Sequence, residues 1–113
     1  MYVEERVYTV QPGKSAEYLK NYAEIGLQVQ LRHLPHLTGY YFTEVGDLNL
    51  IIHQWAYDDL NQRDKCRAAL AADPDWQTYL VKNRPLIVSQ ENRLMKCAPF
   101  FVERLKKMLA ASK

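Results

Sequence analysis

The chain lacks the features that would place it in several large classes of protein. Only two of its 113 residues are cysteines and only four are glycines. No uncharged stretch approaches the roughly 20 apolar residues that a membrane-spanning helix needs. An excess of one charge is missing too, because 15 basic residues face 13 acidic ones and the formal net charge is +2. The sequence therefore predicts no membrane span, and its charge gives no case for nucleic-acid binding.

The few cysteines and glycines form no known motif. Cys66 and Cys97 lack the paired spacing of a zinc site, so we expect reduced thiols of the kind found in a cytoplasm. The glycines are scattered, which excludes a glycine-rich phosphate loop. The first residues, MYVEERVYTV, carry acids where a signal peptide carries positive charge. We therefore expect a cytoplasmic protein.

What is present fits one folded domain. Hydrophobic residues make up 48% of the chain and charged residues 25%, which are ordinary values for a globular domain. Alternating or β-branched segments predict four strands, at residues 2–10, 37–45, 50–57 and 86–96. The GDLN sequence after Val45 predicts a tight turn that joins the second and third strands as an antiparallel hairpin.

Helical periodicity predicts four helices between and after these strands, at residues 16–34, 60–72, from 74 through Leu80, and 100–111. Pro35 ends the first of them, because proline disfavours the helical conformation in the residue before it. Asp58 or Asp59 is expected to cap the second helix, and Asp73-Pro74 to start the third.

The order strand, helix, strand, strand, helix, strand predicts an α+β fold, the ferredoxin-like βαββαβ plait with a four-stranded antiparallel sheet. Helices cover only one face of such a small sheet. Both faces are nevertheless apolar, with Val3 and Val7 on one side of the first strand and Tyr2, Tyr8 and Val10 on the other. We therefore infer a homodimer in which two sheets face each other.

The third strand carries the most specific candidate site. Alternation turns His53, Trp55 and Tyr57 to the same face. A histidine in a pocket is suited to acid/base work near neutral pH, and an indole ring to stacking on an apolar ligand. The alternative is a sheet histidine that bonds to a neighbour, with Trp55 as part of the core. A buried histidine needs a partner in either case.

Two further pairs are candidate ligand-binding residues. Arg6 and Tyr8 share a face of the first strand, which lies beside the third in this topology, so Arg6 is a candidate to hold a carboxylate or enolate near His53. The equally open alternative pairs Arg6 with Glu4 or Glu44. Gln90 and Asn92 share a face of the fourth strand and suit neutral hydrogen bonds to a ligand, although the dimer seam is an alternative place for them.

A metal site is not expected. His33 and His36 are three residues apart, but Pro35 interrupts the helix between them and no third ligand is near in sequence. Zinc and iron sites usually need three or four protein ligands. We expect no metal and no cofactor.

Four segments resemble the NIPSNAP family, in that family's order and across roughly residues 2–97. They are EERVYTVQPGKSAEYL, GYYFTEVGDLNLIIHQWAYDDLNQR, AALAADPDWQTYL and QENRLM. The resemblance implies a dimeric α+β barrel, a superfamily that includes small cofactor-free monooxygenases and stress-response proteins. It does not imply a particular reaction. Residues 1–97 would form the family domain, and residues 98–113 an added amphipathic helix and tail.

Two hypotheses follow from these residues and from the resemblance. In the first, a homodimer binds a small, partly apolar organic molecule and acts on it without a cofactor, as a monooxygenase or isomerase. His53 would then be the acid/base, Arg6 the anion holder, and Trp55 and Tyr8 the stacking walls. In the second, the barrel is a non-catalytic scaffold, and the C-terminal helix recruits a partner.

Overall fold

The computed structural model describes residues 1–111, so the last two residues of the predicted 98–113 segment lie outside the described part. Four strands form one antiparallel sheet in the order β2-β3-β1-β4. The strands are β1 (Tyr2–Val10), β2 (Leu37–Phe42), β3 (Leu50–Tyr57) and β4 (Ile87–Lys96). The predicted α+β plait is confirmed, with β1 beside β3 in the centre of the sheet.

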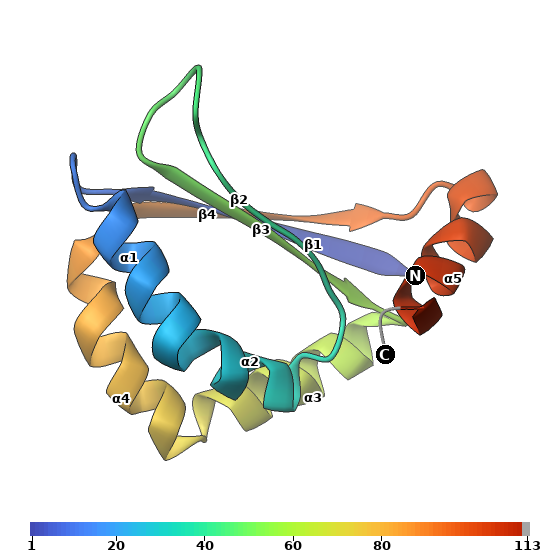
Figure 1. Cartoon of the computed structure of the whole chain (residues 1–113). Coiled ribbons are helices and arrows are strands. Elements are labelled where there is room, and N and C mark those ends of the chain that lie inside the picture. Colours follow the sequence, from blue (N-terminus) through green and yellow to red (C-terminus); the bar gives the residue numbers. More distant parts are fainter. Residues whose placement is uncertain (112–113) are drawn as a thin grey trace.

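The helical layer covers one face of the sheet (Figure 1). Its segments are α1 (Ser15–Asn21), the π-helical turn η1 (Tyr22–Gly26), α2 (Leu27–His33), α3 (Leu60–Ala71), α4 (Pro74–Asn83) and the short 3₁₀ turn η2 (Arg84–Leu86). None of the helices within residues 1–111 has the length and apolar character needed to cross a membrane.

Aspartates start two of these helices, as the sequence predicts. The Asp59 carboxylate accepts a hydrogen bond from the backbone N–H of Gln62 at 2.7 Å, at the start of α3. Asp73 accepts one from the backbone N–H of Asp75 at 2.9 Å, and Pro74 follows at the first position of α4. Each cap satisfies a backbone donor that the helix itself leaves unpaired.

The first predicted helix contains a π-helical turn that its hydrophobic periodicity does not predict. The π-helical turn between α1 and α2 takes in one more residue than an α-helical turn does. Residues eight apart in a continuous α-helix point about 80° apart around the axis. Here the extra residue brings Tyr22 and Gln30 to one face, where the Tyr22 hydroxyl and the Gln30 side-chain oxygen are 2.5 Å apart.

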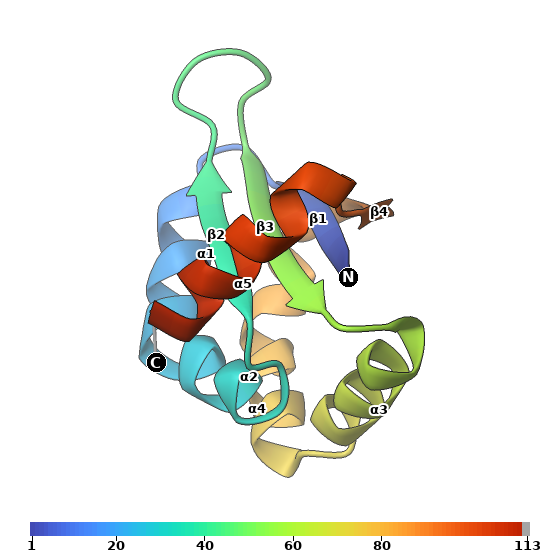
Figure 2. The same cartoon turned by 90° about the vertical axis from the view of Figure 1, so that its right-hand side faces the viewer.

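The second strand is shorter than predicted. Pairing with β3 ends at Phe42, and residues 43–49 form a wide connection in place of a tight turn. Gly46 and Asn49 have positive φ angles of 107° and 66°, so the backbone leaves the extended conformation here. In Figure 2 this connection projects beyond the end of the sheet.

The C-terminal helix lies on the face opposite the other helices (Figure 2). A 3₁₀ turn, η3 (Pro99–Phe101), leads into α5 (Val102–Ala111), so the α-helix starts two residues later than predicted. Leu105 and Leu109 pack against Ala56 of β3 and Val3 of β1. The helix therefore covers only one end of this face, which we call the open face.

Candidate functional site

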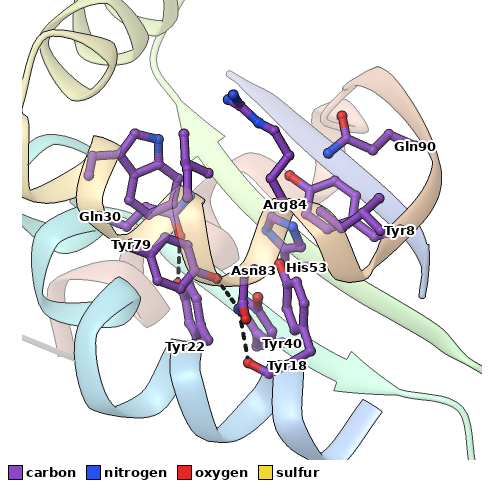
Figure 3. Close-up of a pocket in the computed structure, with 13 residues that line it drawn as sticks. Tyr8, Tyr18, Tyr22, Gln30, Tyr40, His53, Tyr79, Asn83, Arg84 and Gln90 are labelled. Atoms are coloured by element: carbon purple, nitrogen blue, oxygen red, sulfur yellow. Dashed lines mark hydrogen bonds between the residues drawn. The ribbon is translucent and has the colours of Figure 1, made fainter. Parts of the chain in front are cut away.

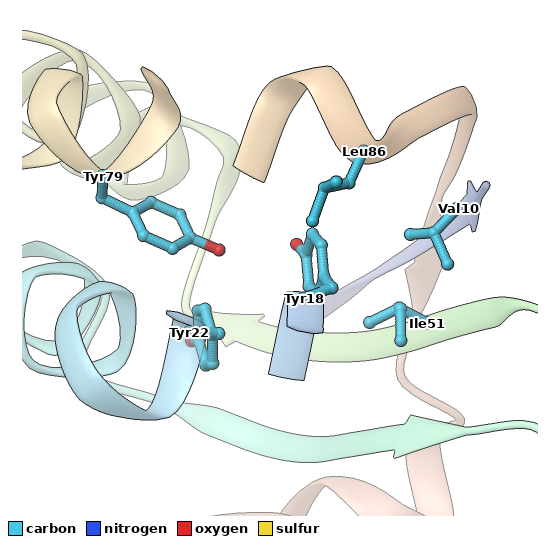
Figure 4. Close-up of a cluster of buried hydrophobic side chains, with 6 residues drawn as sticks. All are labelled: Val10, Tyr18, Tyr22, Ile51, Tyr79 and Leu86. Atoms are coloured by element: carbon cyan, nitrogen blue, oxygen red, sulfur yellow. The ribbon is translucent and has the colours of Figure 1, made fainter. Parts of the chain in front are cut away.

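The core between sheet and helices is rich in tyrosine. One cluster joins strand residues to side chains of α1, η1 and α4, as Figure 4 shows. Its buried members are Val10, Tyr18, Tyr22, Ile51, Tyr79 and Leu86. A second cluster includes Trp55 and Tyr57 of β3 under α2 and α3. Between these clusters the sheet presents His53, a polar residue in an apolar setting.

His53 is 1% exposed and is enclosed by aromatic rings. Tyr40, its register partner on β2, stacks on the imidazole with ring centroids 4.8 Å apart. Tyr8 meets the imidazole edge-on at 4.9 Å. These contacts fix the plane of the imidazole ring, because two rings from neighbouring strands hold it on different sides.

A hydrogen bond from Trp55 sets the tautomer of His53. The indole Nε1–H donates to His53 Nδ1 at 2.7 Å. An indole nitrogen only donates, so Nδ1 must carry the lone pair and, in the neutral ring, Nε2 carries the proton. Within the described chain, His53 Nε2 is buried and has no hydrogen-bond partner. The protein thus presents an unpaired N–H donor inside its core.

The imidazole stays neutral at physiological pH. Burial, followed by the charges of Arg6 and Arg67, lowers the pKa of His53 to about 3. A general base works best with a pKa near the operating pH. The role of acid/base expected for His53 from the sequence therefore does not suit this environment, whereas a role as hydrogen-bond donor does.

A small cavity adjoins His53, with a volume of about 30 Å³. That is room for one or two water molecules. The lining comes from both layers, as Figure 3 shows, and comprises Tyr8, Tyr18, Tyr22, Gln30, Tyr40, His53, Trp76, Tyr79, Leu80, Asn83, Arg84, Ile87 and Gln90. Five of the eight tyrosines in the chain are among them.

Four of these tyrosines, Tyr18, Tyr22, Tyr40 and Tyr79, remain protonated. Burial raises the pKa of Tyr18, Tyr22 and Tyr40 well above the ordinary value, and neighbouring phenols add to the effect. Burial likewise raises the pKa of Tyr79 to about 12. The hydroxyls of these four tyrosines and the imidazole of His53 are therefore neutral, and Arg84 and Gln90 at the rim of the cavity are exposed.

Asn83 ties the helices together at the wall of the cavity. Its Nδ2 donates to the Tyr79 hydroxyl at 2.7 Å and to the Tyr18 carbonyl at 3.0 Å, and its Oδ1 accepts from Asn21 at 2.8 Å. This amide is 1% exposed. Since α1 and α4 both depend on it, it holds the tyrosine side of the cavity in place.

Next to the cavity lies a buried ionic cluster around Glu4, which is fully buried. Arg63 of α3 donates two hydrogen bonds to the carboxylate, at 3.2 and 2.9 Å. Arg6 donates to it at 3.1 Å and Asn92 at 2.7 Å. Burial alone would raise the pKa of Glu4, but the bonds from Arg63 and Asn92 and the charge of Arg6 lower it to about 2.

The structure thus brings together only some of the residues expected to form the site. His53, Tyr8 and Gln90 line the cavity. Arg6, the register partner of His53, does not line it and binds Glu4 and the Tyr8 hydroxyl, which is the alternative that the sequence left open.

The other expected site residues lie around the cavity rather than in its wall. Asn92 binds Glu4. Trp55 is a donor to His53 rather than a stacking wall. Tyr57 is 1% exposed, shares the helix-side cluster with Trp55, and its hydroxyl makes no hydrogen bond of ordinary geometry to the described residues.

Several residues of the cavity were not anticipated as site residues. Tyr18 and Tyr22 belong to the apolar stripe of the first helix, and Tyr79 to that of the third, so each of them is also what a packed core requires. A signal was present in the number of tyrosines, because a phenol brings a hydroxyl into the core that needs a partner. His33, a candidate metal ligand, instead contacts Asp73 at 2.8 Å.

The fold and this cavity define a ferredoxin-like α+β domain with a neutral aromatic site between its sheet and its helices. The chain belongs to the NIPSNAP family, whose model matches residues 3–101. It is 34% identical over 102 residues to human Protein NipSnap homolog 3A, covering 88% of this chain. It spans only 40% of that relative's length.

Solved structures agree with this assignment. Protein Atu4242 from Agrobacterium tumefaciens matches with a TM-score of 0.87 and 43% identity, over 88% of this chain and 96% of that chain. A NIPSNAP-like domain protein from Burkholderia xenovorans gives 0.85 and 38%, over 88% and 86%. A putative antibiotic biosynthesis monooxygenase from Nitrosomonas europaea gives 0.63 at 13% identity, over 86% and 98%, which is a likeness of fold.

Proposed function

We propose that this NIPSNAP domain binds a small, partly apolar organic molecule that places an oxygen atom against His53 Nε2–H. The observation that carries the proposal is the unpaired N–H itself, because a buried donor without a partner costs about 1–3 kcal/mol. A carbonyl, enolate or phenolate oxygen would remove that cost. Water at the same position is the resting alternative.

The size of the cavity limits how such a molecule would bind. A volume of about 30 Å³ admits an oxygen-bearing end but not a whole substrate, since ligand pockets usually span about 300–1,000 Å³. The rest of the ligand would lie toward the exposed rim. Arg84 and Gln90 would have to move there, and neither side chain makes a hydrogen bond or ion pair with the described residues to hold it.

The chemistry supported by this site is stabilisation of negative charge on oxygen. A fixed neutral N–H donor in a buried cavity stabilises an oxyanion without any reorganisation. Isomerisations and cofactor-free oxygenations both suit such a site, because both pass through an enolate or phenolate. The shared fold with the monooxygenases is compatible with this reading. The pKa of His53 is about 3 and that of Tyr79 about 12, so neither serves as a base near neutrality, and a substrate that ionises readily is favoured.

The test uses two ligands of nearly equal size. Acetophenone carries a carbonyl acceptor, and ethylbenzene carries no oxygen at all. We expect the ketone to bind at least tenfold more tightly, and His53→Phe to abolish that preference because it keeps the ring but loses the donor. Arg93→Gln, on the open face, is the control. Titration calorimetry measures the dissociation constant of each probe. Equal binding of both probes, or an unchanged preference in His53→Phe, would refute the proposal.

We also propose that the domain is a homodimer whose copies meet through their open faces. Val7, Ile52 and Tyr41 are register neighbours on β1, β3 and β2. The alternation that turns His53 toward the helices turns these three away from them. Tyr41 is 55% exposed, and no helix of the described chain covers this apolar stripe. A second sheet is the ordinary partner for such a face.

The alternative function is a dimeric scaffold without catalysis, and the small size of the cavity is the observation that favours it. In that reading α5 would recruit a partner through Phe100, which is 89% exposed. Truncation after Cys97 separates the possibilities. Because Leu105 packs against Ala56, we expect the truncated chain to melt at a lower temperature, which would make α5 structural. An unchanged melting temperature and an unchanged dimer would favour recruitment.

A further inference from the structure

The 43–49 connection presents apolar side chains to solvent at one end of the open face. Val45 is 89% exposed and Leu48 is 62% exposed. The acids Glu44 and Asp47 stand beside them. Positive φ angles at Gly46 and Asn49 shape the connection, which Figure 1 shows rising on the side away from the helices. An acidic loop that exposes two aliphatic residues is costly unless something covers it.

The opposite end of the same face holds an apolar groove of about 480 Å³ between α5 and the strands. Its apolar wall consists of Val3, Met95, Phe100, Phe101, Leu105 and Met108. Among the described residues that line the groove, Lys96 is the one charged residue, and none is acidic. Arg104 shares a helix face with Phe101 and Met108, because it comes three residues after the first and four before the second.

The position of α5 restricts how a second copy can cover the open face. The helix occupies one end of that face, so two copies facing each other with their α5 helices at the same end would collide. They fit when the α5 end of each copy lies over the connection end of the other. A two-fold axis then makes both contacts identical.

We propose that residues 43–49 of each copy dock into the α5 groove of the other, so that the two sheets are closed at both ends. This rests on the homodimer proposed above and adds its orientation and its contacts. Val45 and Leu48 match the apolar wall of the groove. Glu44 and Asp47 are opposite in charge to Lys96 and Arg104, and complementary charges fix the register of an interface.

The test measures the dimer by sedimentation equilibrium of the full chain. Val45→Asp should raise the dimer dissociation constant at least tenfold. The matched control is Val81→Asp, at a residue of α4 that is 75% exposed and far from the open face, and it should leave the constant unchanged. Circular dichroism confirms that both variants fold.

Charge reversal makes the test specific for the pairing. Glu44→Lys with Asp47→Lys should weaken the dimer, as should Lys96→Glu with Arg104→Glu, and an equimolar mixture of these two variants should restore association. A wild-type dimer that Val7→Asp disrupts but Val45→Asp does not would overturn the loop contact and leave the face-to-face dimer standing. A wild type that is monomeric at all concentrations would overturn both, and ligand binding at His53 would be unaffected by either result.

Discussion

At the scale of single residues, the site depends on a hydrogen bond between two neighbours on one face of β3. The Trp55 indole donates to His53 Nδ1, so in the neutral ring the other nitrogen, Nε2, carries the proton and is a donor. Strand alternation predicts that the two side chains point the same way, and they do. It does not predict the bond, because alternation fixes the direction of a side chain but not its rotamer, and the rotamer depends on Tyr40 and Tyr8 from other strands.

The ionic cluster gives a prediction at this scale. Glu4→Gln leaves Arg6 and Arg63 without their carboxylate in a buried position, and breaking a buried ion pair costs about 3–5 kcal/mol. The matched control is Glu5→Gln on the other face, where the partner Arg93 is 61% exposed and surface pairs contribute about 0–1 kcal/mol. Urea unfolding compares the two. Equal losses would contradict a structural role for the Glu4 cluster.

At the scale of elements, the sequence predicts regular segments well and irregular ones poorly. The bounds of β1 and β3 agree with the alternating pattern, because each strand packs a continuous apolar set against its neighbours. The π-helical turn and the 43–49 connection were missed for a common reason. Each involves a local change in backbone geometry that leaves the hydrophobic pattern nearly intact, so periodicity does not reveal it.

Substitution of Gly26 tests how tightly the π-helical turn η1 packs against the core. It ends the π-helical turn, and a Cβ atom there would lie 2.8 Å from ring atoms of both Tyr22 and Tyr79. Gly26→Ala must push rings that line the cavity, and overpacking of a core costs about 1–3 kcal/mol. Ala23→Ser, at an exposed position in the same turn, should stay within about 0.5 kcal/mol. Thermal unfolding of both variants checks this, and a Gly26→Ala protein as stable as wild type would show that the turn can widen.

At the scale of the whole molecule, the sheet order follows from the sequence, but the size of the cavity does not. The order of strands and helices leaves few compact topologies, so the plait could be inferred. The volume beside His53 depends on how closely five tyrosines pack, and no local pattern carries that information. The same holds for Arg6, whose choice between Glu4 and the cavity is decided by Arg63 and Asn92 from distant segments.

Stability should fall on acidification in two steps. The pKa of His53 is 6.5 when the chain is unfolded and about 3 when folded. The contribution of His53 to the free energy of unfolding is therefore complete above pH 6.5. It is lost as the pH falls toward 3, by about 1.4 kcal/mol per pH unit. The pKa of Glu4 falls from 4.5 to about 2 on folding, so its contribution is lost below pH 4.5.

Between pH 6.5 and 5 only the His53 step acts, and about 2 kcal/mol of stability should be lost there. His53→Gln should flatten this part of the profile, while His36→Gln, at a half-buried histidine outside the cavity, should keep it. Urea unfolding at several pH values measures the slopes. A His53→Gln profile as steep as that of wild type would place the acid sensitivity elsewhere.

The protonation state of His53 can be measured directly by ¹⁵N NMR of histidine-labelled protein, titrated from pH 8 to pH 3. We expect His53 to be the neutral Nε2–H tautomer across the range above pH 4, and we expect acetophenone to shift its Nε2–H resonance. A His53 that titrates between pH 6 and 7, or that carries its proton on Nδ1, would contradict its role as a fixed hydrogen-bond donor and return the residue to the role of acid/base.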